Sequence, residues 1–287
     1  MTDGELWARE QLALLRRRGF SPSALAGFLL ASWRRAGEVR GARPELAAQA
    51  RVWVAIGSEP WLAAWLLTPG RRQAARVGLA WWLGCGLMLD WHLGMLETED
   101  GQARALGPAD ALTLLRAWLV PVVWTDPTAA VCALAALTDA LDGPLARRTG
   151  ATRAGRDFDG LVDTAFMLAA LAGARRARLL PGWVVGVEAA RRTLGVMYGV
   201  GSYFLAAQPP DRRTIAAARS LVPVRTVGLV LATSGRCRQA GEVLLGGGAI
   251  ASLILALLSR YRRASQRSIA RRAASATRAT ARTRRVV

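Results

Sequence analysis

Residues 138–166, TDALDGPLARRTGATRAGRDFDGLVDTAF, carry four aspartates in two pairs. Asp139 and Asp142 are three residues apart, and Asp159 and Asp163 are four apart, so each pair lies on one face of a helix. Both pairs interrupt apolar stretches, where a charged side chain is costly unless it is neutralised. Four carboxylates that converge from two helices are best neutralised by divalent metal ions. The stretch therefore predicts a metal site between two apolar helices.

The rest of the chain is both apolar and strongly basic. Its 287 residues have a hydrophobic fraction of 52% and a formal net charge of +19, and the sequence contains no lysine. This combination is typical neither of a disordered protein nor of a soluble domain. The arginines gather at the ends of long apolar segments, and the basic tail has only Tyr261 as an aromatic for base stacking. The composition favours a lipid bilayer as partner and predicts no nucleic acid.

The hydropathy pattern predicts an all-α, polytopic membrane protein. Apolar segments are expected at about 77–97, 108–124, 128–146, 157–174, 182–206, 221–235 and 242–259. A full span needs roughly 20 residues, so several of these segments must tilt or extend beyond the bilayer. The loop at 209–213 breaks the series. Charge bias places the RRTGATRAGR loop and the C-terminal tail in the cytoplasm, although Arg175, Arg176 and Arg178 would then face outward.

The two ends of the chain are expected to differ from this membrane region. Residues 1–76 predict an N-terminal region of amphipathic helices, with Ser21 and Pro22 as a cap and first turn. Such helices either lie on a membrane surface or pack as ordinary cytoplasmic helices. Residues 77–100 predict an extra transmembrane or interfacial helix. The main membrane domain is expected over 101–260, and residues 261–287 predict a disordered basic tail.

The aspartate stretch resembles the hallmark motif of the CDP-alcohol phosphotransferase family. The shared pattern is Asp139-x-x-Asp142-Gly143-x-x-Ala146-Arg147, then seven residues, then Gly155-x-x-x-Asp159-x-x-x-Asp163. Every fixed position is present. The similarity continues in ALTLLRAWLVPVVW at 111–124, LPGWVVGVEAARRTLG at 180–195 and VRTVGLVLA at 224–232. About 107–260 therefore matches the six-helix core of the family, whereas the first hundred residues do not.

The resemblance implies a role for each motif residue. Asp139, Asp142 and Asp159 would bind two divalent ions, Mg²⁺ or Mn²⁺. Asp163 would also touch this metal site and would act as the catalytic base for the hydroxyl of the acceptor. The nucleotide and diphosphate would be bound by the remaining motif positions: Gly143 and Ala146 leave room for the cytidine, Arg147 holds the diphosphate, and Gly155 permits close approach of a helix or of the nucleotide.

The same resemblance implies an activity and a setting. The activity is transfer of a phosphatidyl group from a CDP-linked donor, CDP-diacylglycerol or another CDP-alcohol, to an alcohol acceptor with release of CMP. The setting is a six-transmembrane-helix core in the plasma membrane, multi-pass, with the site facing the cytoplasm, in a homodimer. The physical chemistry agrees, because such a transfer needs charge neutralisation at phosphate oxygens and an aligned nucleophile.

The sequence does not identify the acceptor alcohol. Four arginines in or near apolar segments are candidates for contacts with an acceptor phosphate or a lipid phosphate: Arg116, Arg191, Arg192 and Arg225. Alternatively, they reach the interface and contact lipid headgroups nonspecifically. Pro144 follows Gly143 and can bend the second core helix. Pro223 stands where many family members have a basic residue, which leaves contacts near Arg225 in question.

Two other functions fit parts of the pattern. An intramembrane, Mg²⁺-dependent prenyltransferase would also use aspartates and a diphosphate donor, but the Gly and Ala-Arg positions after Asp142 oppose it. A catalytically inactive membrane scaffold would use the basic tail and the N-terminal helices and would not need the metal site.

Overall fold

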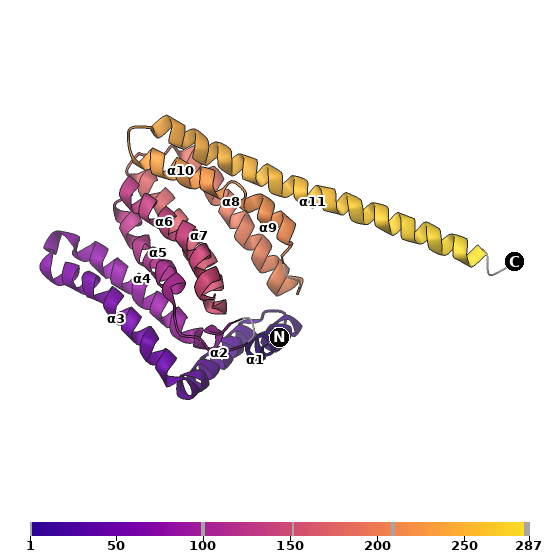
Figure 1. The fold of residues 1–287 in the computed structure, drawn as a ribbon, viewed down its shortest axis with the longest axis horizontal. Helices are drawn as coiled ribbons and strands as arrows, with labels where there is room; N and C mark the ends of the chain where they lie inside the picture. The colour runs from indigo at the N-terminus through magenta and orange to yellow at the C-terminus, as the bar shows by residue number, and fades with distance from the viewer. Residues whose placement is uncertain (1, 99–100, 151, 208–209, 284–287) are drawn as a thin grey trace.

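The computed structural model describes residues 2–98, 101–150, 152–207 and 210–283 of the chain. Within these ranges the chain is helical and contains no strand, and one isolated bridge joins Glu97 and Ala103. The predicted all-α class is therefore confirmed over the described ranges. Figure 1 shows the helices as a tilted bundle, with the N-terminal helices along one side and one end of it.

The N-terminal region consists of four helices and two short turns. The helices are α1 (Asp3–Arg17), α2 (Pro22–Ala42), α3 (Pro44–Leu67) and α4 (Arg72–Trp91), and the 3₁₀ turns are Pro69–Arg71 and Leu93–Met95. Thr2 and Glu5 form a capping box at the start of α1. Ser21 caps α2 and Pro22 occupies its first turn, as the sequence predicts.

The following helices form the predicted membrane region. They are α5 (Pro108–Thr125), α6 (Ala129–Thr149), α7 (Arg153–Arg176), α8 (Gly182–Val200), α9 (Arg212–Arg219), α10 (Val222–Thr233) and α11 (Arg238–Thr283), with a π turn at Gly201–Leu205 after α8. The bounds of α5 to α10 follow the apolar segments expected from the sequence, whereas α11 continues well beyond the expected segment 242–259. The short α9 occupies the region after the break at 209–213.

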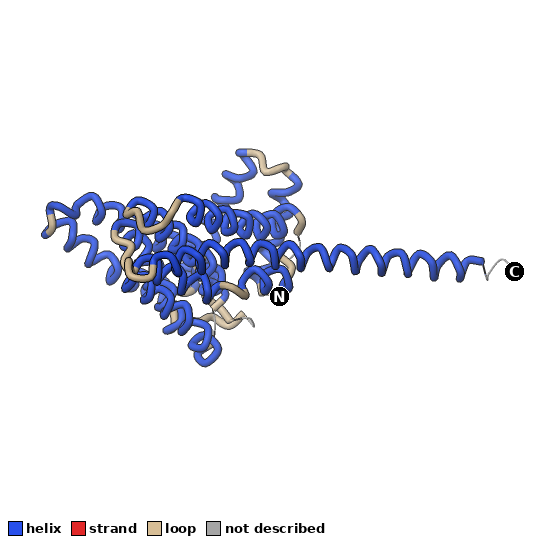
Figure 2. Tube along the Cα trace, turned by 90° about the horizontal axis from the view of Figure 1, so that it is seen from above, coloured by secondary structure: helices blue, strands red, loops and turns tan. Residues whose placement is uncertain are grey.

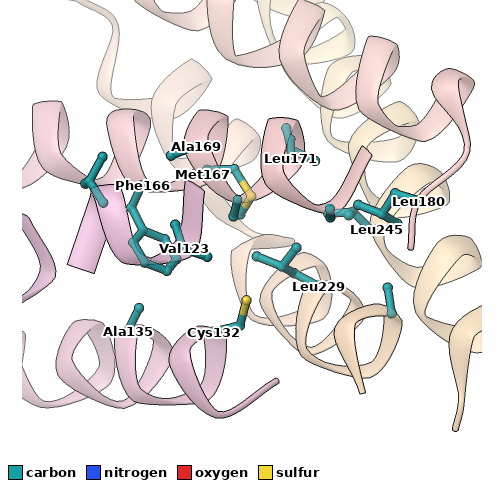
Figure 3. Packing of buried hydrophobic residues seen from close by; sticks show 14 of the residues in the cluster. Val123, Cys132, Ala135, Phe166, Met167, Ala169, Leu171, Leu180, Leu229 and Leu245 are labelled. Atoms are coloured by element: carbon teal, nitrogen blue, oxygen red, sulfur yellow. The ribbon is translucent and has the colours of Figure 1, made fainter. Parts of the chain in front are cut away.

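The largest apolar cluster lies between these helices. Figure 3 shows Val123 of α5, Cys132 and Ala135 of α6, Phe166 of α7 and Leu229 of α10 packed together. Glycine permits two close approaches of the backbones. A Cβ at Gly173 would lie 2.5 Å from the Val123 carbonyl oxygen, and one at Gly228 would lie 2.6 Å from the Leu245 backbone nitrogen. These contacts fix α7 against α5 and α10 against α11.

Three helical stretches in the described part of the chain are long and apolar enough to cross a membrane. They are Ala129–Thr149, Arg212–Thr233 and Arg238–Tyr261. Their large apolar side chains are exposed at positions such as Leu137, Val227 and Leu257, as is expected where lipid and not water covers the surface. The chain is accordingly a membrane protein.

Helix α11 extends far beyond the bundle. It continues through most of 261–287, for which the composition predicts disorder, and ends at Thr283. Both Figure 1 and Figure 2 show its C-terminal half projecting away from all other helices. Alanine and arginine, which dominate this segment, have high intrinsic helix propensity, so the helix that begins in the bundle can propagate outward.

Candidate active site

The two aspartate pairs are carried by consecutive helices that share a neighbour. Gly150 ends α6 with a φ of 82°, a conformation that favours glycine. Thr152 caps α7, since its hydroxyl oxygen accepts the Gly155 N–H at 2.9 Å. Both α6 and α7 pack against α5. The C-terminal half of α6 and the N-terminal half of α7 therefore direct their carboxylates toward the same part of α5.

Arg116 of α5 lies among the four carboxylates. Its side chain is 2% exposed. One terminal nitrogen is 2.5 Å from Asp142 Oδ2, and the other is 2.7 Å from Asp159 Oδ1 and 3.5 Å from Asp139 Oδ1. The latter nitrogen also forms an ion pair with Asp163. The sequence suggested a contact of Arg116 with acceptor or lipid phosphate, whereas the structure pairs it with the aspartates.

The carboxylates are arranged so that they could bind a metal ion. Asp139, Asp159 and Asp163 each offer one oxygen, and these oxygens lie within 4.8 Å of one another. All three residues are half-buried. Four carboxylates and one guanidinium leave a net charge of −3, and carboxylate oxygens are the ligands that Mg²⁺ and Mn²⁺ prefer. The residues present therefore fit divalent ions, with Asp142 set somewhat apart on the other side of Arg116.

Gly143, Ala146 and Arg147 of the motif lie on α6 beside the aspartates. Ala146 is half-buried, and Arg147 is exposed beside the aspartates on α6. A Cβ at Gly143 would lie 3.5 Å from a terminal nitrogen of Arg147, so this side chain folds back over the glycine. The surface at Gly143 and Arg147 is thus cationic, which suits a diphosphate.

Gly155 permits the close approach of α7 to α5. A Cβ at Gly155 would collide with the carboxylate of Asp110 and lie 2.8 Å from the Thr152 hydroxyl oxygen. Asp110 is buried and accepts the Thr152 hydroxyl and the Gly107 N–H, each at 2.8 Å. Of the two roles expected for Gly155, the structure supports helix packing. Sequence reasoning missed Asp110, and the one signal was its position three residues after Gly107, in the first turn of α5.

A second charged cluster lies on α8 and α10. Glu188 is fully buried and accepts hydrogen bonds from Arg191 at 2.9 Å, Arg192 at 3.3 Å and Arg225 at 2.7 Å. Nε of Arg225 is buried and has no hydrogen-bond partner in the described part of the chain. One acid among three arginines leaves a net charge of +2. Arg192 also interacts electrostatically with Asp163, so this cluster adjoins the aspartate site.

The N-terminal region is joined to the start of α7. Arg153 donates to the Thr2 hydroxyl at 2.7 Å, to Glu97 at 3.3 Å and to Glu5 at 2.5 Å. Partial burial of the Glu5 carboxyl opposes ionisation, but the hydrogen bond from the Thr2 backbone and the charge of Arg153 outweigh it and lower the pKa of Glu5 from its ordinary value. At its other end, α1 reaches the π turn Gly201–Leu205, where Arg16 donates to the carbonyl oxygen of Tyr203 at 3.3 Å.

Comparison with known proteins identifies the family. The family model for CDP-alcohol phosphatidyltransferase matches residues 107–258, which is more than half of the chain. The match begins at α5 and ends within α11, so it contains both charged clusters. No curated protein and no solved structure matches the chain significantly. The match over α5 to α11 and the aspartate site within it show that this chain belongs to the CDP-alcohol phosphatidyltransferase family.

Proposed function

We propose that this protein transfers a phosphatidyl group from CDP-diacylglycerol to an alcohol, with release of CMP, in phospholipid biosynthesis. The observation that carries the proposal is the convergence of Asp139, Asp159 and Asp163 on one point of a membrane helix bundle. Family membership supports the CDP-linked donor, because the matched region contains this site. A donor with acyl chains in lipid and a nucleotide in water suits a site near the membrane surface.

The four aspartates would hold two divalent ions, Mg²⁺ or Mn²⁺. When bound, these ions neutralise charge on the diphosphate and its transition state. Asp139, Asp142 and Asp159 are the proposed metal ligands. Asp163 also borders the site and is the proposed base. The acceptor oxygen attacks the phosphorus that bears the diacylglycerol, the proton passes to Asp163, and the bond to CMP breaks with its electron pair leaving on CMP.

The nucleotide would bind along the C-terminal half of α6. The absence of a side chain at Gly143 and the small side chain of Ala146 leave room for the cytidine, and the exposed guanidinium of Arg147 would pair with the diphosphate. Gly155 contributes indirectly, since it lets α7 pack against α5 and thereby sets the position of Asp159.

The acceptor is proposed to be an anionic alcohol. The cluster of Arg191, Arg192 and Arg225 around Glu188 keeps a net positive charge next to Asp163. A phosphate on the acceptor would offset this charge and would bring the hydroxyl group toward the base. Arg116 is assigned to the aspartate site and not to the acceptor.

The remaining parts of the proposal concern the setting of the enzyme. The region from α5 to α11 forms the six-helix transmembrane core, with α9 and α10 together making one crossing. The protein is proposed to lie in the plasma membrane as a multi-pass homodimer, with the aspartate site facing the cytoplasm. The last turn of α6 carries Arg147 and Arg148 and the first turn of α7 carries Arg153, and this positive charge supports the proposed orientation.

The proposal is tested by supplying the purified protein with CDP-diacylglycerol, Mg²⁺ or Mn²⁺ and one acceptor at a time. Glycerol 3-phosphate, inositol phosphate and phosphatidylglycerol represent anionic acceptors, and inositol and serine represent acceptors without a phosphate. CMP release is expected with an anionic acceptor. No CMP with any acceptor would count against phosphatidyl transfer, and release with inositol or serine alone would contradict the anionic assignment.

A further inference from the structure

Helices α3 and α4 form an antiparallel hairpin whose outer surface is apolar. On α3 the exposed large side chains are Val52, Ile56, Leu62, Leu66 and Leu67, and on α4 they are Val77, Leu83 and Leu87. From Val77 to Leu87 no exposed residue of α4 is charged. This surface lies outside the region matched by the family model.

The hairpin is as long as a bilayer is thick. Helix α3 has 24 residues and α4 has 20, which at 1.5 Å per residue gives about 36 Å and 30 Å. The hydrocarbon core of a bilayer is about 30 Å thick. In Figure 1 the hairpin runs beside α5 with a moderate tilt, so it is aligned with the helices of the membrane region.

Three tryptophan N–H groups hold the hairpin together and join it to α5. Trp82 donates to the Val54 carbonyl at 2.8 Å, and Trp81 donates to the Ala117 carbonyl of α5 at the same distance. Trp118 of α5 donates to the Gly57 carbonyl at 2.9 Å. The charged residues Arg51 and Glu59 of α3 and Arg76 and Asp90 of α4 lower the mean hydropathy of the two helices. Neither helix is among the three stretches of the described chain that qualify as spans by length and composition.

Charged residues flank the apolar surface at both ends. The turn between the helices carries exposed Arg71 and Arg72, and the other end carries the Arg40–Asp90 ion pair. Arg51 and Glu59 are exposed charges beside the apolar side chains of α3. Arg51 lies seven residues from Pro44 and Glu59 eight residues from Leu67, or about 10 Å and about 12 Å along the axis, so each lies closer to one end of the helix.

We propose that α3 and α4 cross the bilayer as a transmembrane hairpin beside the six-helix core, with lipid acyl chains covering its outer surface. The end of α3 that begins at Pro44 lies near the start of α5, since the Gln49 side chain pairs with the backbone of Leu106. Helices α1 and α2 then lie on the side of the membrane where α7 begins. Helix α3 thus belongs to the region 1–76, for which the sequence predicts amphipathic helices. Most of α4 belongs to 77–100, for which the sequence predicts an extra transmembrane or interfacial helix.

The topology is tested with cysteines at the two ends of α3. Gly41 and Gly70 are both exposed, and no atom lies within 4 Å of a Cβ added at either position, so Gly41→Cys and Gly70→Cys are matched and mild. They are made in a Cys237→Ala background, because Cys237 is exposed whereas Cys85 and Cys132 are buried. Cys237 of the parent chain lies in the connection between α10 and α11. Figure 1 shows this connection at the end of the bundle away from α1.

The label is a membrane-impermeant maleimide, added to intact cells before and after permeabilisation. The proposal predicts that Gly70→Cys and Cys237 of the parent are labelled in the same state of the cells, either both in intact cells or both only after permeabilisation. Gly41→Cys is then labelled in the other state. Labelling of both variants from one side, or failure of Gly70→Cys to label even after permeabilisation, overturns the proposal.

The occupant of the apolar surface is tested separately. Bimane attached at Ile56→Cys or Leu83→Cys should be quenched severalfold in vesicles of phosphatidylcholine brominated in the acyl chain, whereas bimane at the exposed, basic position Arg17→Cys should not. Oxidative crosslinking of Ile56→Cys between copies, without quenching, would show that a second copy of the chain covers this surface and would refute the lipid assignment. Neither readout depends on catalytic activity.

Discussion

The position of Arg116 leads to a prediction about both stability and metal binding. The variant is Arg116→Gln, which keeps much of the size and removes the charge. Arg116 is 2% exposed and pairs with all four aspartates. Removing one partner of a buried charge cluster typically costs about 3–5 kcal/mol. In a domain of this size that loss corresponds to a fall in Tm of roughly 6–20 °C.

The remaining carboxylates give the second part of the prediction. Three of their oxygens lie within 4.8 Å of one another. At an effective dielectric constant of about 20, two unit charges at that separation repel by about 3.5 kcal/mol. Without Arg116 this repulsion loses the one cation that pairs directly with all four carboxylates, so the stability of the variant should depend more strongly on added cation. A divalent ion at a free concentration of 100 times its Kd would restore about 2.7 kcal/mol of the free energy of unfolding.

The assay is thermal unfolding in detergent with EDTA, Mg²⁺ or Mn²⁺, and Arg76→Gln on the exposed surface of α4 is the control. The Tm of Arg116→Gln should fall sharply in EDTA and recover in part with metal, more than the parent or the control does. A variant that unfolds like the parent in EDTA, and that gains no more from metal, would refute the role assigned to Arg116.

Three further predictions concern other parts of the structure. Gly155→Ala should destabilise the protein by about 1–3 kcal/mol in thermal unfolding, because its Cβ meets Asp110 and Thr152, whereas Gly160→Ala, with open space around it, should not; equal effects would contradict the α5–α7 contact. Glu188→Gln should lower the free energy of unfolding by about 3–5 kcal/mol, because it leaves three arginines without their acid. Inorganic phosphate should restore part of this stability, and a stability that does not respond to phosphate would oppose an anion site. Since the pKa of Glu5 is lowered in the folded protein, its ion pair with Arg153 should stabilise α1 above the ordinary pKa of a glutamate, and this stability should be lost as the pH falls through the lowered pKa. Proteolysis of α1 should follow this change, and Glu5→Gln should abolish this pH dependence.

Much of the core could be predicted from the sequence because its signals are local. The hydropathy of 108–124 and 128–146 gives α5 and α6 nearly to the residue, and the aspartate spacing gives the face of α6 and α7 on which the site lies. These features depend only on residues a few positions apart.

The features that were missed depend on contacts between distant segments. The distance in sequence between Arg116 and Asp159 is 43 residues, and nothing local indicates that they pair. Asp110 and Arg153 were missed for the same reason, since their partners lie on other elements. The C-terminal tail is a separate case, because no distant contact is involved. Its composition predicts disorder, whereas α11 extends to Thr283, in line with the high helix propensity of alanine and arginine.

The central claim is metal-dependent transfer with Asp163 as base, and the rate of CMP release from CDP-diacylglycerol tests it most directly. The rate is measured with the best acceptor while Mg²⁺ is titrated, for the parent, Asp163→Asn and the control Asp126→Asn, which alters an exposed aspartate outside the site. The account predicts no release in EDTA, a loss of about 10²–10⁴-fold in Asp163→Asn and an unchanged rate in the control. Release at the parental rate by Asp163→Asn, or in EDTA, would contradict it.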